Sequence, residues 1–249
     1  MASTSNPPLG LTWSDLPVPT RRSSVERVTA RYRQGLAEFV WDAAVLENNP
    51  FTFVEVQTLL DGVTVGGHKL SDQQQIVRLA ASNKELDQLV RSSRFRLDKA
   101  TSDRLHKIIA TDEALEAGHF RGEGEVGGPD SRVSVSLGER GRYEAPAAGD
   151  DGAILRRIHA EGLVAIGELD DPFHRGLVYF AFGALQQFYF DGNKRTARHM
   201  MNGTLMSAGY DAISIPAARK LEFNTTMVDF YTSRDATDLL DFLASCSPK

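Results

Sequence analysis

The chain has 249 residues, of which 41% are hydrophobic, 24% charged and 8% aromatic, the ordinary usage of a globular protein. This composition excludes collagen-like, coiled-coil and wholly disordered chains, and the length allows a sizeable buried core. The net charge is −5, from 28 basic and 33 acidic residues, without a block of like charge. We therefore expect no nucleic-acid partner, because sequence-independent binding to nucleic acid needs a basic surface.

The single cysteine and the lack of long apolar runs bear on the compartment. Cys246 is alone, so it cannot form an internal disulfide, and a reducing compartment suits it. No secretory signal is visible at the N-terminus. The longest uncharged apolar run, residues 176–190, is shorter than the roughly 18 to 20 residues that cross a bilayer. We expect a cytoplasmic protein without a membrane partner.

The first hundred residues divide into an arm and a helical region. Residues 1–22 are rich in Ser, Thr and Pro and lack helical periodicity, which predicts a loose arm. Residues 23–46 follow a helical apolar stripe, which ends before Pro50 because the residue before a proline avoids the α region. Thr52 and Glu55 have capping-box spacing, so the next helix should begin there. A further helix at about 71–94 completes an expected N-terminal region, residues 23–100.

The remaining residues, 101–249, are expected to form the core domain. A helix is expected at about 102–117. Residues 132–137 then alternate with period two and precede a glycine turn, the only hairpin signal in the chain. Further helices are expected at about 152–166, 172–190 and 194–208, with two shorter ones within 216–246. The fold class is therefore mostly α with one small hairpin.

The stretch from Gln187 to Arg198 carries the chemistry. It has the pattern of a buried helix, a tight polar turn and a new helix, on which Arg195 and Arg198 share one face. The turn would thus bring free backbone N–H groups, a positive helix end and two guanidiniums together, which predicts an anion site. Asp191 is placed to hold a hard cation that bridges phosphates. The alternative is a plain helical turn with a capping aspartate and surface arginines.

This stretch resembles the signature of the Fic (filamentation-induced-by-cAMP) family, His-x-Phe-x-Asp/Glu-Gly-Asn-Gly/Lys-Arg-x-x-Arg. Six residues match it: Asp191, Gly192, Asn193, Lys194, Arg195 and Arg198. The resemblance covers roughly residues 24–245. It implies a Fic-type helical bundle with a small β-hairpin flap, and transfer of AMP from ATP to a protein hydroxyl with magnesium.

The resemblance also implies a role for each matching residue. Asp191 would hold Mg²⁺, while Gly192 and Asn193 would line the site of the α- and β-phosphates. Arg195 would hold the phosphates, and Arg198 would hold the γ-phosphate.

Two further expectations follow from the resemblance. The hairpin from Val133 to Tyr143 would be the flap that docks a segment of a target protein by strand addition. Dimers are common among relatives, so a homodimer is compatible with the resemblance, although no patch in the sequence demands one.

The sequence departs from the signature at two positions. Gln187 stands where the family has the histidine that deprotonates the target hydroxyl, and Tyr189 replaces the phenylalanine. Glutamine can orient a hydroxyl but cannot accept its proton, and loss of a general base costs about 10² to 10⁴-fold in rate. Three accounts stay open: a nucleotide-binding pseudoenzyme, altered chemistry with another base, or a deliberate substitution that traps the protein. His174 and His199 are weak candidates for a replacement base.

Lys194 opens an alternative function. Many family members have glycine at this position, and a lysine resembles the death-on-curing toxin branch, whose members transfer the γ-phosphoryl group. A protein phosphoryl transferase is therefore a second hypothesis. A third is a partner-binding module that uses the flap and groove without catalysis. No His, Asp or Glu cluster has the spacing of zinc ligands.

Glu47 and Asn48 resemble the family's inhibitory motif, Ser/Thr-x-x-x-Glu-Gly/Asn, on a helix that precedes the core. In the family this glutamate pairs with the second arginine of the signature and blocks the γ-phosphate position. The resemblance therefore implies that Glu47 binds Arg198 and inhibits the site. Ala43 replaces the Ser/Thr, so the contact is expected to be looser. The alternative is a surface glutamate at a helix end.

Overall fold

The computed structural model describes residues 4–6, 8–126, 128 and 131–248. Over these residues the fold is mostly helical. The helices are α1 (Val25–Gln34), α2 (Leu36–Leu46), α3 (Phe53–Leu60), α4 (Leu70–Arg91), α5 (Lys99–Ala110), α6 (Ala153–Gly167), α7 (Pro172–Gln186), α8 (Asn193–Ser207), α9 (Lys220–Ser233) and α10 (Thr237–Ser245). Two antiparallel hairpins pair β1 (Thr4–Asn6) with β2 (Leu11–Trp13) and β3 (Ser134–Ser136) with β4 (Arg142–Glu144). The mostly α class and the hairpin at β3–β4 are confirmed, while the β1–β2 hairpin was not predicted.

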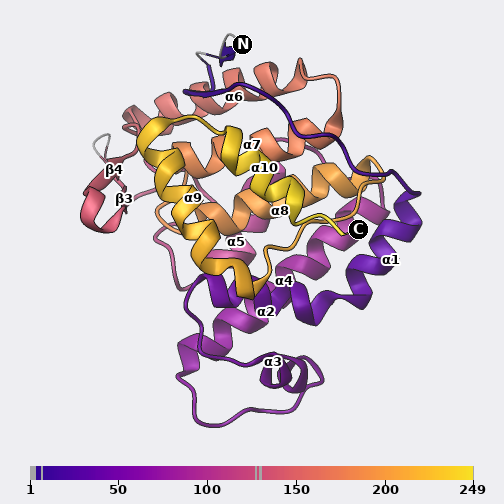
Figure 1. The fold of residues 1–249 in the computed structure, drawn as a ribbon. Coiled ribbons are helices and arrows are strands. Elements are labelled where there is room, and N and C mark those ends of the chain that lie inside the picture. Colours follow the sequence, from indigo (N-terminus) through magenta and orange to yellow (C-terminus); the bar gives the residue numbers. More distant parts are fainter. Residues whose placement is uncertain (1–3, 7, 127, 129–130, 249) are drawn as a thin grey trace.

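Helices α7 and α8 form the centre of the molecule (Figure 1). Asp171 caps α7 by accepting a hydrogen bond from the Phe173 N–H, and a proline occupies its first turn. Nearly every side chain of α7 is buried, as its all-round apolar sequence requires. The helix ends at Gln186 rather than near residue 190, because Gln187 adopts a left-handed conformation with φ of 49°. This early end forms the polar turn to α8.

The N-terminal segment corrects the expectation of a loose arm. Leu9, Leu11 and Trp13 are buried in the main core. Strand β2 is also fixed by backbone hydrogen bonds, from the Thr12 N–H to the Arg234 oxygen (2.9 Å) and from the Ala236 N–H to the Thr12 oxygen (2.8 Å). Three apolar side chains among polar neighbours were enough to anchor the segment to the α9–α10 junction. Residues 1–3 and 7 lie outside the described part.

Two predicted helices have different bounds in the structure. The stripe expected over 23–46 is divided at Gly35 into α1 and α2. The helix expected to reach residue 117 ends at Ala110, because the chain then takes positive φ angles at Asp112 (62°) and Glu116 (54°). Residues 111–118 are consequently a tight irregular turn that lies next to α8.

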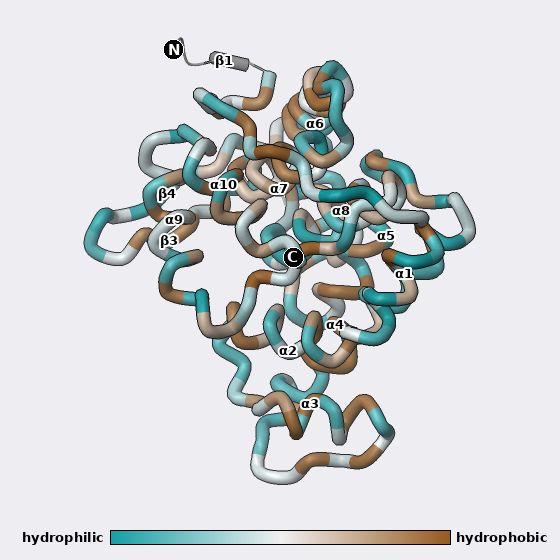
Figure 2. The backbone as a smooth tube through the Cα atoms, turned by 45° about the vertical axis from the view of Figure 1, so that its right-hand side comes forward, coloured by the Kyte–Doolittle hydropathy of each residue, from teal (hydrophilic) through white to brown (hydrophobic). Residues whose placement is uncertain are grey.

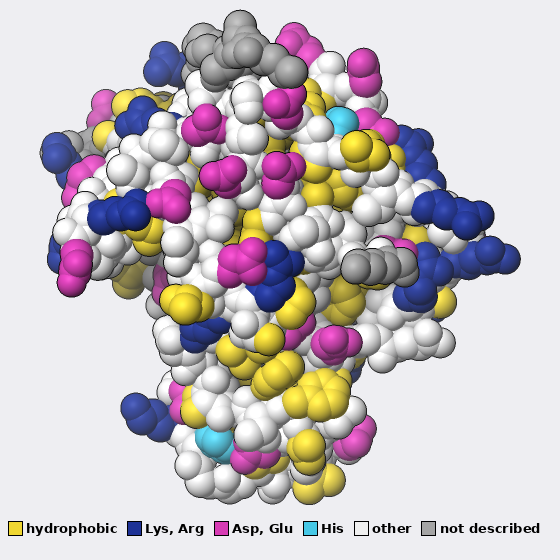
Figure 3. All heavy atoms as spheres, in the orientation of Figure 1, with side chains coloured by type: hydrophobic (Ala, Val, Ile, Leu, Met, Phe, Trp, Pro, Cys, Tyr) yellow, Lys and Arg dark blue, Asp and Glu magenta, His cyan; other side chains and the backbone are white. Residues whose placement is uncertain are grey.

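A small lobe around α3 projects from the main body in both backbone views (Figures 1 and 2). It has its own apolar cluster, which includes Val56 of α3 and Ile76 of α4. Its surface also carries apolar side chains, among them Val54 and Val63 (Figure 3). Across the described residues, no helix has the length and hydropathy required to pass through a membrane.

Candidate nucleotide site

A cavity of about 250 Å³ lies at the N-terminus of α8. Its walls are the C-terminal end of α2, the strand β3, the polar turn and one residue of α9. Seven of the eight residues that sequence analysis assigned to the site line it: Glu47, Gln187, Asp191, Gly192, Asn193, Lys194 and Arg195. The eighth, Arg198, lies one helical turn further along α8.

The polar turn is held by the side chain of Asn193. Its Oδ1 accepts a hydrogen bond from the Tyr189 N–H (2.8 Å), and its Nδ2 donates to the Tyr189 oxygen (2.8 Å) and to Gln187 Oε1 (3.0 Å). Gly192 follows a left-handed path with φ of 71°. The Asn193 side chain therefore fixes the shape of the turn, and the first backbone N–H groups of α8 are left without helical acceptors.

Arg195 and Arg198 are buried cations with unused hydrogen-bonding capacity. Their side chains are only 3% and 8% exposed. Nε of Arg195 and both Nη atoms of Arg198 are buried without a hydrogen-bond partner, whereas Nη1 of Arg195 pairs with the Glu113 carboxylate. Unsatisfied buried donors are costly, and those on a cation are the most costly. Together with the positive end of α8, these atoms fit a multiply charged anion such as a row of phosphates.

Glu47 lies beside Arg198, as sequence analysis predicted. Its Oε1 is 3.8 Å from Arg198 Nη2, and its side chain is 21% exposed. Burial by itself would raise the pKa of Glu47, but Lys194, Arg195, Arg198 and Lys220 together lower it below the ordinary glutamate value. The carboxylate is therefore charged at neutral pH and offsets part of the positive charge of the site.

The end of α2 that carries Glu47 is tied to the core at two places. Asp42 accepts hydrogen bonds from Ser214 Oγ (2.7 Å) and the Ala217 N–H (2.8 Å). Lys220 Nζ donates to the Val45 oxygen (2.5 Å) and to the side chain of the residue after Glu47 (2.8 Å). These contacts lie on both sides of Glu47, so its position is set by the fold and not by the long Arg198 contact alone.

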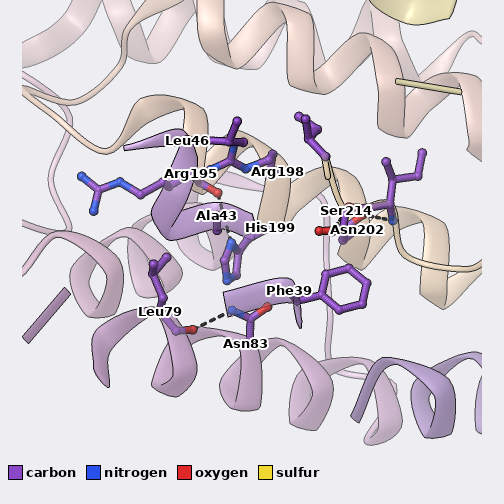
Figure 4. Close-up of a pocket in the computed structure, with 12 residues that line it drawn as sticks. Phe39, Ala43, Leu46, Leu79, Asn83, Arg195, Arg198, His199, Asn202 and Ser214 are labelled. Carbon is purple, nitrogen blue, oxygen red and sulfur yellow. Dashed lines mark hydrogen bonds between the residues drawn. The ribbon is translucent and has the colours of Figure 1, made fainter. Parts of the chain in front are cut away.

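A second cavity, of about 20 Å³, lies behind the two arginines and is lined by Ala43, Arg198 and His199 (Figure 4). It can hold one water molecule. His199 Nδ1 lies 3.0 Å from the Arg195 oxygen and so carries the proton, while Nε2 has no partner. Burial lowers the pKa of His199 to about 4. His199 does not line the larger cavity, so it does not reach a substrate hydroxyl there.

Gln187 is occupied by the protein itself. Its Nε2 donates to the Ala184 oxygen (2.6 Å) and to Tyr231 Oη (3.3 Å), and its Oε1 accepts from Asn193. Three of its four hydrogen-bonding positions are thus used. The other candidate base, His174, bonds to the Pro17 oxygen (2.9 Å) away from the cavity.

Asp191 is the carboxylate most available to a metal ion. Its side chain is 63% exposed at the cavity wall, and Oδ1 accepts the Gly192 N–H (2.6 Å). The described residues contain no group of three or more His, Cys, Asp or Glu side chains that could enclose an ion. One exposed carboxylate fits Mg²⁺ that arrives with phosphates better than a resident metal, since Mg²⁺ is commonly bound by one or two carboxylates plus substrate phosphates.

Several residues near the site were not predicted from the sequence. Glu113 Oε2 lies 2.7 Å from Arg195 Nη1, and Tyr231 lines the cavity from α9. His106 Nδ1 accepts the Gly118 N–H (2.9 Å), so its Nε2 donates to the Asp191 oxygen (2.9 Å). These contacts join segments far apart in the chain, and no local pattern signals them.

Tyr189, the second departure from the signature, is explained by α5. Its hydroxyl bonds to Ser102 Oγ (2.7 Å) and donates to Asp103 Oδ1 (2.9 Å), and its ring stacks on His106 at 3.7 Å. The added oxygen therefore ties the turn to α5 and does not enter the cavity.

Known proteins share both sequence and fold with this chain. None of the protein-family models that were compared matches it. In sequence it is similar to the protein adenylyltransferase Fic of Drosophila grimshawi, with 22% identity over 234 residues, 91% of this chain and 45% of that protein. The protein adenylyltransferase Fic of Drosophila mojavensis is 20% identical over 219 residues, 87% of this chain and 41% of that protein. The chain spans less than half the length of these relatives.

Solved structures with the same fold agree with these relatives. A Fic family protein from Desulfovibrio desulfuricans G20 has a TM-score of 0.67 at 16% identity, over 89% of this chain and 69% of that chain. Fic-1 from C. elegans has a TM-score of 0.68 at 15% identity, over 89% and 67%. IbpAFic2, solved while covalently tethered to Cdc42, has a TM-score of 0.50 at 14% identity, over 92% and 66%. The chain therefore has the fold of these Fic family proteins and is similar to the Fic relatives in sequence.

Proposed function

We propose that the cavity binds ATP at the N-terminus of α8, and that the chain is a Fic-type protein adenylyltransferase whose site is closed by Glu47. The observation that carries this proposal is the pair of buried guanidiniums, Arg195 and Arg198, whose Arg195 Nε and two Arg198 Nη atoms have no hydrogen-bond partner in the described part of the chain. A phosphate chain at the positive end of a helix would satisfy them. The Glu47 carboxylate and the terminal phosphate would then compete for Arg198.

The residues of the polar turn and of the start of α8 would each bind a different part of the nucleotide or its metal ion. The N–H groups at the start of α8 and the Arg195 guanidinium would bind and orient the phosphates. Lys194, half-buried at the cavity wall, adds positive charge beside them. Asp191 would hold Mg²⁺, which neutralises phosphate charge and stabilises the departing pyrophosphate when bound.

The chemical step is weakened at Gln187. In AMP transfer the target oxygen bonds to the α-phosphorus, the bond to the β-phosphate breaks, and the hydroxyl proton must leave. Gln187 cannot accept that proton, and its amide is already held by Ala184, Asn193 and Tyr231. The proton would pass to solvent, and we expect transfer to be about 10² to 10⁴-fold slower than with a histidine at this position.

The Gln187 side chain, which cannot accept a proton and is already hydrogen-bonded within the protein, also favours a second candidate, an ATP-binding protein without transferase activity. The two candidates share the nucleotide site and differ only in the chemical step. Transfer of label from α-labelled ATP to any protein supports the first, and ATP binding without transfer supports the second.

A protein target is part of this proposal. Strand β3 contributes Ser134, Val135 and Ser136 to the cavity wall, so a segment paired with β3 would pass over the phosphate site. The neighbour IbpAFic2 was solved tethered to the protein Cdc42, which is consistent with a protein substrate for this fold.

Calorimetric titration with ATP and Mg²⁺ tests the site. Glu47→Ala should bind ATP at least about tenfold more tightly than the wild type, a difference of about 1.4 kcal/mol, because the competing carboxylate is gone. Glu38→Ala, on the exposed side of the same helix, is the matched control and should bind as the wild type does. If Glu47→Ala binds no nucleotide, the proposal is wrong.

A further inference from the structure

Arg121 is a fully buried arginine outside the cavity. Its side chain is 0% exposed, and it has no ion-pair partner among the described carboxylates. Instead, the guanidinium donates to three backbone oxygens. Nε donates to Gln187 (2.7 Å), Nη2 to Pro146 (2.9 Å) and Nη1 to Ser131.

The three acceptors belong to two functional parts of the molecule. Ser131 and Pro146 flank the β3–β4 hairpin, so one guanidinium spans both ends of the hairpin, next to the bond from the Ala145 N–H to the Val133 oxygen (3.1 Å). The third acceptor is the residue at the position of the family histidine. Its carbonyl is free for Arg121 because Gln187 terminates α7, where helix carbonyls have no partner of their own.

The arrangement is costly unless the planar fork itself is needed. A buried cation without a carboxylate loses hydration that three neutral oxygens replace only in part. Lysine, a compact point charge, could not reach three oxygens in one plane as arginine does. The geometry of the guanidinium, and not its charge alone, therefore explains its presence.

The β3–β4 hairpin is short, so its stability depends on contacts such as those of Arg121 with the rest of the protein. Each of its strands has three residues, and an isolated two-stranded hairpin is marginal in water. A second tie is the Tyr143 ring, which packs on the Tyr231 ring at 5.1 Å. Tyr231 in turn accepts a hydrogen bond from the Gln187 side chain. The hairpin is thus connected to Gln187 twice, through Arg121 to the Gln187 backbone oxygen and through Tyr143 and Tyr231 to the Gln187 side-chain amide.

We propose that Arg121 is a positioning residue that fixes the β3–β4 hairpin relative to the turn at Gln187, so that a protein segment paired with β3 presents its hydroxyl at the phosphate site. The purpose of the positioning rests on the proposed function. The positioning itself does not, since Arg121 does not touch the cavity.

Hydrogen exchange of the intact chain tests the proposal. In Arg121→Lys the hairpin amides of Leu137 and Ala145 should exchange at least about tenfold faster, while the amides of α7 and α8 keep their rates. Arg132→Met removes an exposed arginine from the same segment and should leave hairpin exchange unchanged. Unchanged hairpin exchange in folded Arg121→Lys, or equal acceleration in α7 and α8, would overturn the proposal.

A spectroscopic probe separates positioning from general stability. With 3-fluorotyrosine at position 143, the wild type and Arg132→Met should give one fluorine resonance, and Arg121→Lys should give a broadened or second one. An unchanged resonance in Arg121→Lys contradicts the proposal. ATP titration in the Glu47→Ala background should give the same affinity with and without Arg121→Lys. Absence of ATP binding in both would reject the proposed function, while hairpin exchange would still decide the role of Arg121.

Discussion

Glu47 Oε1 and Arg198 Nη2 lie 3.8 Å apart, too far for a direct hydrogen bond, although both side chains are largely buried. The fold brings them together through Asp42 and Lys220, which anchor the end of α2 on either side of Glu47. A carboxylate that lies near an arginine without a direct hydrogen bond to it can be displaced by a stronger anionic ligand, because its displacement breaks no hydrogen bond to the arginine.

This relationship predicts opposite effects of Glu47→Ala with and without nucleotide. Without nucleotide the variant should unfold at a lower temperature than the wild type, because the buried Arg198 loses the carboxylate nearest to it. With saturating ATP and Mg²⁺ its melting temperature should rise by more than that of the wild type, since ligand bound to the native state stabilises it. Thermal denaturation with Glu38→Ala as control measures both. Equal ATP shifts in variant and wild type would mean that Glu47 does not compete with nucleotide.

Gln187→His should restore a general base. Histidine tolerates a positive φ better than most residues, so the φ of 49° at this position is no obstacle. In a Glu47→Ala background, label transfer from α-labelled ATP to protein in cell extract should rise by about 10² to 10⁴-fold. The matched control is Gln186→His, because Gln186 is equally buried but bonds to the Leu9 oxygen outside the cavity. No rise, in a variant that still binds ATP, would mean that more than the base has been lost.

Glu113→Gln should strengthen ATP binding. Glu113 Oε2 lies 2.7 Å from Arg195 Nη1, so its charge opposes an incoming phosphate, whereas a glutamine oxygen could still accept from Arg195 and keep it oriented. We expect an affinity gain of a few-fold to about tenfold that shrinks as salt rises, because ionic screening weakens the effect. Asp112→Asn removes a charge from the same turn at a residue that pairs with Arg78, and should change affinity less. Weaker binding in Glu113→Gln would show that its charge is needed to place Arg195.

The sequence predicted features whose residues lie close together in the chain, and it did not predict contacts between residues that are far apart in the chain. The polar turn, its two arginines and Glu47 were predictable because capping residues, helical spacing and a long signature lie within short windows. Arg121 and Glu113 were not, because each acts on a residue more than sixty positions away, and only the folded chain brings them together. The buried Leu11 and Trp13 were missed for the same reason, since the strand that carries them bonds to Arg234 and Ala236, more than 200 positions away.

Stability should fall as the pH drops from about 6.5 to 4, and His159 should account for part of the loss. The ring is buried in α6, and its Nε2 lies 3.2 Å from Tyr179 Oη. Burial, helped by the nearby charge of Lys99, lowers its pKa to about 4. Between this value and the unfolded value of about 6.5 the unfolded chain binds more protons than the folded one, so stability rises with pH across that window.

One histidine contributes up to about 1.4 kcal/mol per pH unit to that slope. Denaturant titrations between pH 4 and 8 should show a shallower slope for His159→Gln than for the wild type below pH 6.5, and a constant difference above it. His106 and His199, whose pKa values are also lowered to about 4, act equally in both proteins and cancel in the comparison. His119→Gln, at an exposed histidine, should keep the wild-type slope. Parallel curves for His159→Gln and the wild type would mean that the pKa of His159 is the same in the folded and the unfolded chain, and would contradict this prediction.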